Sequence, residues 1–210
     1  SDSHKIYLNE KLKKFISNKK VWVASSTHSG EEKVCAMTHQ ILKKKYKDLL
    51  TIIIPRHVDR IPKIEKEINN MDLKTHIHNS NRIVKKQTEV YLVNTYGETK
   101  SFFNTCKNVF LGGSIVPHGG QNPLEAARYG CNIIHGPHVN NFLDIYLFLK
   151  KNKISIKINN SKQIANILEN FFSKKNKPKI IQKKINNIGK KILNLTYKEI
   201  NFFIKKHETQ

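Results

Sequence analysis

Residues 108–125 read NVFLGGSIVPHGGQNPLE, and this stretch decides which fold class the chain can adopt. Residues 109–111 form a short apolar run, as in a strand buried inside a parallel sheet, and the run ends at Gly112-Gly113. Glycine lets the backbone turn sharply there and approach a ligand closely. The stretch therefore predicts a strand that runs into a glycine-rich loop.

A helix is expected to follow this loop. Asn122 is a favoured N-cap residue, Pro123 suits the first helical position, and Glu125 stands where an acid reaches back to the cap backbone. Free backbone N–H groups in the loop and at the helix N-terminus form an anion site, for which phosphate is the expected ligand. Two glycines alone would indicate only a tight strand-to-helix connection, but four glycines and a well-formed cap favour a ligand loop. The loop by itself does not name the ligand.

Strands and helices alternate along the remaining chain. Apolar runs predict further strands at residues 21–24, 49–54, 74–78, 90–94, 131–134 and 154–158. This alternation predicts an α/β fold, with a Rossmann-like parallel sheet and helices on both of its faces. No Gly-x-Gly-x-x-Gly follows the first strand, which argues against a dehydrogenase, and the P-loop pattern is missing as well.

Three helices are predicted in more detail. Glu31 and Glu32 stand in the first turn of one helix, where the helix dipole favours acids. Ser161 is the expected N-cap of a helix that runs to about residue 172, and the pattern after Pro178 continues helically to about residue 204. The spacing in the helix after residue 30 predicts a buried stripe, formed by Val34, Met37, Thr38, Ile41 and Leu42.

Polar residues follow two of the predicted strands, at the edge where open α/β sheets bind ligands. Arg56 comes after the strand at 49–54 and is a candidate partner for a phosphate or a carboxylate. Gly97 would let the chain lie against a flat base, and Glu98 either contacts a ligand or caps the next helix. His76 and His78 share a strand face, and two histidines without a third ligand are expected to be edge residues rather than a metal site.

The chain holds 38 Lys and Arg against 16 Asp and Glu, a formal net charge of +22 at pH 7. Its 210 residues suit a single α/β domain, residues 1–210. Residues 150–210 contain sixteen lysines, no arginine and three glutamates, so a Lys-rich helical tail is expected from about residue 160. Lysine without arginine is typical of a solvated surface, and attraction to an anionic membrane is the next interpretation.

The cysteines show no spacing typical of a metal site. Cys35, Cys106 and Cys131 each lie in an apolar setting, so we expect reduced core residues. No apolar run has the length of a membrane span, and no signal-peptide pattern is present. These observations predict a soluble, cytoplasmic fragment that needs no metal and no cofactor.

Several motifs, in this order along the chain, resemble those of the 3-deoxy-D-manno-octulosonic acid (Kdo) transferases. The most specific is the stretch 112–125, and the resemblance extends from about residue 21 to residue 172. The other matching segments are residues 24–32, Pro55-Arg56-His57 with Arg60, Gly97-Glu98, and Gly136-Pro137-His138 with Asn141-Phe142. In that family this half is the donor-binding domain of a two-domain glycosyltransferase of the GT-B architecture. The resemblance therefore implies that the acceptor-binding N-terminal domain is absent here.

The resemblance also implies a site. In lipopolysaccharide biosynthesis the family transfers Kdo from CMP-Kdo to a lipid A precursor at the cytoplasmic face of the Gram-negative inner membrane. The family's CMP contacts map onto Pro55, Arg56, Tyr96, Gly97, Glu98, Asn122, Pro123, Leu124 and Glu125. Candidate contacts to the donor sugar are Ser26, Thr27, His118 and His138.

The catalytic base is expected outside this chain. In the family it is an acidic residue of the N-terminal half, so Glu31, Glu32 and Glu98 are not expected to replace it. The fragment is therefore predicted to be inactive without its N-terminal domain. At Tyr96 and Ser29 the chain departs from the commoner family pattern, which affects the detail of the base contacts.

Two other functions remain open. Another GT-B enzyme that uses a UDP donor would share the fold. A basic nucleic-acid-binding domain would account for the charge, but it calls for arginine and aromatic residues interleaved along a basic surface. The aromatic residues of the tail follow helical core spacing instead, so we expect no nucleic-acid partner.

Overall fold

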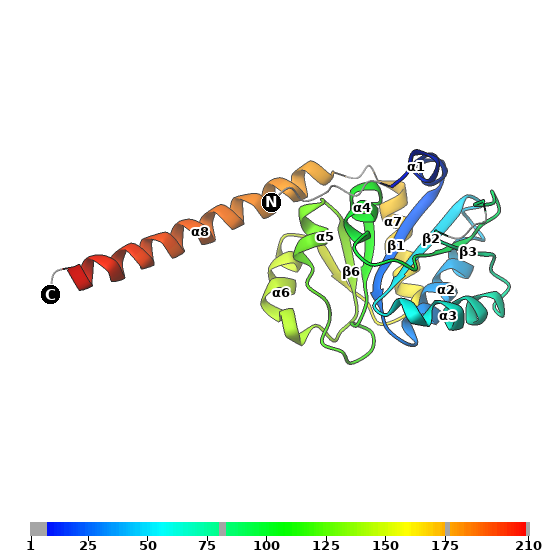
Figure 1. The fold of residues 1–210 in the computed structure, drawn as a ribbon, viewed down its shortest axis with the longest axis horizontal. Coiled ribbons are helices and arrows are strands. Elements are labelled where there is room, and N and C mark those ends of the chain that lie inside the picture. The colour runs from blue at the N-terminus through cyan, green and yellow to red at the C-terminus, as the bar shows by residue number, and fades with distance from the viewer. Residues whose placement is uncertain (1–7, 80–82, 175–176, 209–210) are drawn as a thin grey trace.

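Seven strands, all paired in parallel, form the centre of the structure in the order β3-β4-β2-β1-β5-β6-β7. This computed structural model describes residues 8–79, 83–174 and 177–208 (Figure 1). The strands are β1 (Lys20–Thr27), β2 (Leu49–Pro55), β3 (Thr75–Ile77), β4 (Val90–Leu92), β5 (Asn108–Leu111), β6 (Asn132–His135) and β7 (Ser155–Lys157). The predicted α/β fold with a parallel sheet is confirmed.

Helices connect the strands. They are α1 (Glu10–Ser17), α2 (Glu31–Leu42), α3 (Ile61–Asn69), α4 (Thr99–Thr105), α5 (Leu124–Arg128), α6 (Leu143–Lys151), α7 (Ser161–Ser173) and α8 (Pro178–Glu208), with 3-10 turns η1 (Val58–Arg60) and η2 (Asn140–Phe142). Apolar residues of α1, α4, α5 and α6 pack in one core cluster, and those of α2, α3 and α7 pack in another. The helices therefore cover both faces of the sheet, as predicted.

Strand β1 shows why the two cores form. Side chains alternate between the faces of a strand, so Trp22 and Ala24 join the core under α2, α3 and α7, whereas Val23 joins the other core. Trp22 is fully buried and is the only tryptophan of the chain. Both faces of this strand are apolar because helices cover both, which is why it reads as an unbroken apolar run.

Two predicted details of the helices are wrong. Met37, expected in the buried stripe of α2, is 42% exposed, whereas Cys35 and Ala36 are fully buried. The small Cys35 and Ala36 side chains let α2 lie close to the sheet, so packing overrides the spacing of the larger apolar residues. The N-cap of α7 is Asn160 rather than Ser161, because the Asn160 side chain accepts a hydrogen bond from the Gln163 backbone N–H at 3.0 Å.

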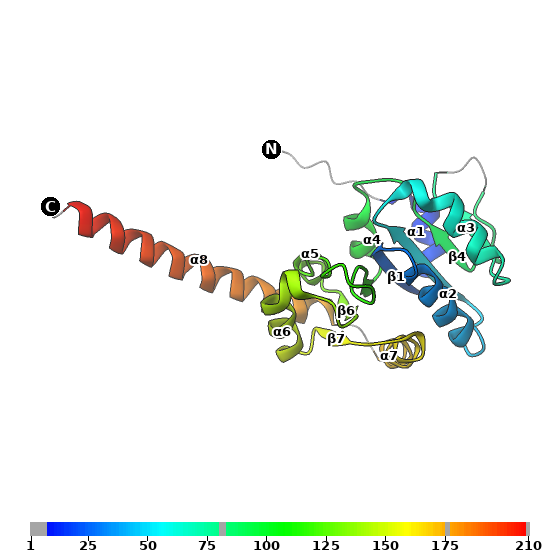
Figure 2. The same cartoon turned by 90° about the horizontal axis from the view of Figure 1, so that it is seen from below.

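The end of the chain contains two different helices. Helix α7 packs against α2, whereas α8, with 31 residues, extends away from the sheet in both views (Figures 1 and 2). Among the α8 side chains that the structure describes, Ile185 and the partly buried Ile181 at the beginning of the helix join a core, while Tyr197 and Ile200 are exposed. Within the described part of the chain, no helix combines the length and apolarity needed to span a membrane.

Candidate functional site

The sheet reverses its winding direction between β1 and β5. From β1 the chain continues to β2 on one side, and from β5 it continues to β6 on the other. In open parallel sheets, ligands bind at such a reversal, outside the carboxyl ends of the strands. The predicted site residues lie at or after the carboxyl ends of five neighbouring strands, in the order β4 (96–98), β2 (55–56), β1 (26–27), β5 (118 and 122–125) and β6 (138).

The glycine loop after β5 is closed by a carboxylate of the chain itself. Glu31, which is fully buried, accepts hydrogen bonds from the backbone N–H groups of Gly113, Ser114 and Ile115 at 2.7, 3.0 and 2.9 Å. It also accepts one from the N–H of His28 at 2.9 Å. We call these four amides and the carboxylate the Glu31 nest. For residues 113–115 the prediction of amides free for a phosphate is therefore wrong, because an internal anion occupies them.

Close packing explains the first glycine of the loop. A Cβ atom added at Gly112 would meet the carbonyl oxygen of Ser26 and lie 2.6 Å from Cα of Thr27. Gly112 also donates a backbone hydrogen bond to Ser25 at 2.8 Å. The close approach expected between Gly112 and a ligand is thus an approach to the end of β1.

Glu32, the second acidic residue in the first turn of α2, is also paired. Glu32 is 1% exposed and makes two hydrogen bonds to the guanidinium of Arg60, each 3.0 Å long. The hydroxyl of Thr27 donates a further bond to Glu32 at 2.8 Å. Thr27 is itself fully buried, so its side chain faces this pair rather than solvent. Arg60, part of the family-like segment, thereby stabilises the fold.

Three histidines gather next to the nest. The rings of His28 and His118 stack with centroids 4.1 Å apart, and His57 lies edge-on to His28 at 6.2 Å. Burial lowers the pKa of His28, as does the neighbouring His118, while Glu31 opposes this shift. His138 reaches the same loop through its backbone N–H, which donates to Ser114 at 2.8 Å. The structure therefore brings His118 and His138 to the edge where the sequence placed them.

A cleft of about 300 Å³, which we call the α5 cleft, opens beside the nest. Its lining comprises Ser25, Ser26, Thr99, Phe103, Leu111, Gln121, Asn122 and Glu125. Ser26 has φ 55°, in the left-handed region that residues other than glycine rarely adopt. The cleft thus unites Ser26, Asn122 and Glu125, which lie in segments far apart in the sequence.

The predicted cap of α5 needs a correction. The helix begins at Leu124 with Pro123 in the cap position, one residue later than expected. Asn122 still accepts a hydrogen bond from the Leu124 N–H at 3.0 Å. Among the described residues, no capping bond of the Glu125 side chain is found; its carboxylate lies 3.4 Å from Nζ of Lys100 on α4. Because the helix begins one residue later, Glu125 is its second residue rather than its third, and the cap residue Pro123 has no backbone N–H to donate, so the predicted capping box does not form.

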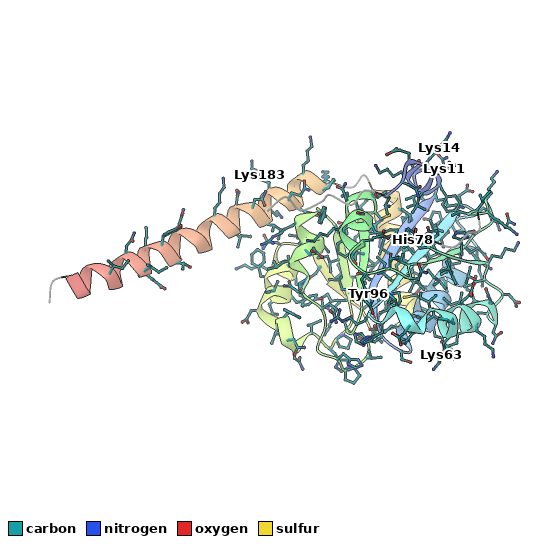
Figure 3. All side chains as sticks on the ribbon, viewed as in Figure 1. Lys11, Lys14, Lys63, His78, Tyr96 and Lys183 are labelled. Atoms are coloured by element: carbon teal, nitrogen blue, oxygen red, sulfur yellow. The ribbon has the colours of Figure 1, made fainter. Side chains whose placement is uncertain are left out.

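The residues after β2 and β4 flank the end of β1. The backbone N–H of Arg56 donates to the carbonyl of Thr27 at 3.0 Å, and its side chain is exposed. Pro55 is buried as the last residue of β2, whereas Tyr96 is 67% exposed (Figure 3). Gly97 has φ +85° with open space around it, so this turn faces solvent.

Glu98 does not cap α4 with its side chain. Its Oε2 accepts a hydrogen bond from the Thr95 hydroxyl at 2.7 Å and lies 2.7 Å from Nε2 of His78. The sequence missed this role of His78, which we expected to be an edge residue. Parallel pairing of β3 with β4 brings His78 beside the turn, and the only signal in the sequence was its position two residues after His76.

A larger cavity, about 520 Å³, lies at the opposite edge of the sheet. It is lined by residues at the amino ends of β6 and β7 and by residues just before and at the start of α8, among them Ile154, Lys177 and Ile181. None of the predicted site residues lines it. We therefore place the candidate site in the smaller α5 cleft, at the edge where parallel sheets bind ligands.

Metal ligands and reactive thiols do not gather at this edge. Within residues 8–79, 83–174 and 177–208, no group of three or more His, Cys, Asp or Glu side chains is arranged to hold a metal ion. The three cysteines are free and buried, and burial raises the pKa of the Cys131 thiol to about 12. The cysteines are therefore unreactive core residues, as expected.

Known proteins resemble this chain in sequence and in fold, although no protein-family model matches it. The chain is 29% identical over 173 residues to the 3-deoxy-D-manno-octulosonic acid transferase of Haemophilus influenzae, covering 82% of this chain and 40% of that protein. It is 33% identical over 182 residues to the enzyme of the same name from Rickettsia prowazekii, covering 85% of this chain and 39% of that protein. The chain thus spans about two fifths of the length of these relatives.

A solved structure shows the same fold. The C-terminal CMP-Kdo binding domain of WaaA from Acinetobacter baumannii superposes with a TM-score of 0.75 at 23% identity, covering 83% of this chain and 91% of that chain. The resemblance predicted from the motifs is thereby confirmed over most of the chain. The chain belongs to the family of 3-deoxy-D-manno-octulosonic acid transferases.

Proposed function

We propose that this chain is the donor-binding part of an enzyme that transfers Kdo from CMP-Kdo to a lipid A precursor in lipopolysaccharide biosynthesis. The observation that carries this proposal is the α5 cleft, which lies at the reversal of the sheet and brings Ser26, Asn122 and Glu125 together. The family relationship supports the reaction, and the related fold named for CMP-Kdo binding supports the donor. The donor is a substrate, and the proposal needs no metal or cofactor.

The nucleotide would lie across the ends of β4, β2 and β5. Glu125, with a side chain 45% exposed, offers acceptor oxygens to the ribose hydroxyls. Asn122, Pro123 and Leu124 bring the chain backbone to the nucleotide, and the exposed Arg56 offsets charge on the departing CMP. The turn Tyr96-Gly97-Glu98 would contact the base, where Gly97 leaves room for a flat ring.

The sugar would lie nearer the histidines. Ser26 lines the α5 cleft, and His118 stacks on His28 next to it, so these two are our preferred contacts for the Kdo carboxylate and hydroxyls. His138 is half-buried on the same loop system and is a further candidate. The Thr27 hydroxyl is bonded to Glu32, so Thr27 would contribute through its backbone at most.

Transfer itself would require a second domain. Glu31, Glu32 and Glu98 are each engaged by groups of the chain, so none is assigned as a base. We infer that the lipid A precursor and the general base are held by an N-terminal domain, and that this chain alone does not turn over. Transfer of Kdo to a lipid acceptor by the purified chain would contradict this inference.

We also infer a site of action at the cytoplasmic face of an inner membrane. Exposed lysines are spread over α1, α3 and α8, where Lys11, Lys63 and Lys183 are labelled in Figure 3. Such a charge distribution is expected to attract anionic head groups, and the attraction is screened by salt. Binding to anionic vesicles should therefore fall as salt rises; equal binding to neutral vesicles would contradict the membrane role.

Calorimetry tests the donor assignment directly. The chain is titrated with CMP and with UDP at the same concentrations and ionic strength. We expect CMP to bind and UDP to bind more weakly, because the turn at Tyr96-Gly97-Glu98 would read the base. Preference for UDP would instead indicate another GT-B enzyme, and binding of neither would contradict the proposed function.

A further inference from the structure

We propose that His78 is a positioning residue of the nucleotide site: it holds the Glu98 carboxylate and, through it, the turn of residues 95–98. This inference rests on the proposed function, in which that turn contacts the base of CMP. His78 follows β3 near the edge of the sheet, and its backbone N–H donates to the Leu92 carbonyl of β4 at 2.7 Å. It therefore lies next to β4, the strand from which the turn emerges; His78 and Tyr96 of the turn are both labelled in Figure 3.

Three polar groups form a chain that ends at Glu98. Nδ1 of His78 lies 2.7 Å from the Tyr91 hydroxyl, and Nε2 lies 2.7 Å from Oε2 of Glu98. No aligned hydrogen bond of Nε2 is found in the described part of the chain, so its approach to Glu98 is a close polar contact rather than a hydrogen bond. The His78 side chain is 6% exposed and the Glu98 side chain 20%, so little water competes for these groups. Through this contact His78, which follows β3, can influence the turn that follows β4.

Tyr91 holds the other side of the His78 ring. Burial, and next to it the Glu98 carboxylate, raise the pKa of Tyr91, so its phenol keeps the proton at neutral pH. The hydroxyl and Nδ1 of His78 lie 2.7 Å apart, and the tautomer of the ring decides which of the two donates. Tyr91 therefore fixes the position of the ring whose Nε2 faces Glu98.

This arrangement leaves one carboxylate oxygen of Glu98 for a ligand. Oε2 is shared by His78 and the Thr95 hydroxyl, whereas no bond of Oε1 is found among the described residues. Nothing lies within 4 Å of a Cβ built at Gly97, so the outer side of the turn is open there. Without His78, the Glu98 side chain would be held by the Thr95 hydroxyl alone, and the turn would hold the base less firmly.

The chain contains a matched control for this pair. His39 is also buried, with Nδ1 at 2.9 Å from the Thr51 hydroxyl and Nε2 at 3.8 Å from Oε1 of Glu89. Glu89 directly precedes β4, so this second histidine lies toward the amino end of the strand whose carboxyl end carries the turn. A substitution of His39 removes a buried histidine and its contacts with Thr51 and Glu89, and it changes no residue of the candidate site.

The test measures CMP affinity by calorimetry and stability by urea unfolding for the full chain. We expect His78→Leu to weaken CMP binding about tenfold, as for the loss of one charge-assisted contact. His78→Gln keeps a donor near the Nε2 position and should stay within about threefold of wild type. His39→Leu should lower stability but leave CMP affinity within about twofold, since distant sites are independent.

Two further variants separate positioning from general destabilisation. In a Glu98→Ala background, His78→Leu should add less than about threefold, because the contact it removes is already gone. Tyr91→Phe removes only the hydroxyl and should weaken binding about threefold, which keeps the test informative even if His78→Leu does not fold. Wild-type affinity in folded His78→Leu or in Tyr91→Phe, or a full additional loss without Glu98, would overturn the role of His78. A wild-type chain that binds no CMP would instead overturn the proposed function.

Discussion

Two segments after β5 lie about ten residues apart, and both resemble anion sites in the sequence. In the Glu31 nest the amides of residues 113–115 are bonded to a carboxylate that is fully buried. At the α5 cleft, Glu125 is 45% exposed on its side chain and faces both Lys100 and open space. The difference teaches that the amides of the nest stabilise the fold by binding the chain's own carboxylate, whereas the carboxylate of Glu125 stays partly exposed and, in the proposed function, meets a ligand.

The largest effect is expected in the nest. Glu31→Gln replaces an acceptor oxygen by an amide group that faces backbone N–H donors, so stability should fall by about 3 kcal/mol or more. Urea unfolding of the variant and of wild type measures this loss. A variant as stable as wild type would show that the nest does not hold the loop, and would remove the basis of the comparison.

Arg60→Met is expected to come next. It leaves the Glu32 carboxylate, 1% exposed, without its cation, and such a loss typically costs about 3–5 kcal/mol. Because the Arg60 side chain is 20% exposed, water can replace part of the interaction, and we expect a loss of about 2 kcal/mol. Urea unfolding checks the value, and Lys63→Met, an exposed lysine on α3, serves as the control. Equal stability of the two variants would contradict the structural role of Arg60.

At the open cleft the effect should appear in binding. Glu125→Gln should cost less than about 1 kcal/mol of stability, because the side chain makes no capping bond. CMP affinity should fall about tenfold to a hundredfold, as for lost charge-assisted bonds to the ribose. Calorimetry and melting curves of the same samples separate the two effects. Unchanged affinity in the folded variant would remove Glu125 from the site.

The smallest effect is expected on stability as the pH is lowered. Because burial and His118 lower the pKa of His28 in the folded chain, the unfolded chain binds a proton more readily below about pH 6.5. The contribution of His28 to stability is therefore present above that pH and is lost as the pH falls. Unfolding free energies at pH 7, 6 and 5 should decline less in His28→Gln than in wild type. Equal declines of the unfolding free energy in the two proteins would show that protonation of His28 does not affect stability.

The sequence predicted most of the fold because the relevant signals are local. A run such as residues 49–54 is apolar on both faces, which only a covered parallel strand permits, and every predicted strand is found within a few residues. Within the predicted stripe of α2 only Met37 is wrong, because the inward face of this helix is set by the sheet and by α7, against which it packs. Neighbours in space, rather than the spacing of large apolar residues, decided which side is buried.

The candidate site was predictable in place but not in detail. The ends of parallel strands meet at one edge, so residues 55–56, 96–98 and 122–125 could be assigned to it from their positions. Glu31 and Gly113 are 82 residues apart, and no local pattern shows that they bond. The same holds for His78 and Glu98, which meet only because β3 pairs with β4. Contacts between segments that are distant along the chain could therefore not be predicted from the sequence.

The buried position of Trp22 determines the fluorescence of the folded chain. It is the only indole of the chain, it is fully covered, and its N–H has no hydrogen-bond partner among the described residues. Its fluorescence should therefore be blue-shifted in the folded chain and move to longer wavelength on denaturation. Trp22 lies near the amino end of β1, away from the α5 cleft, so its emission reports the packing of the sheet against α2, α3 and α7. Loss of CMP binding without a spectral change would then be read as a local effect at the edge.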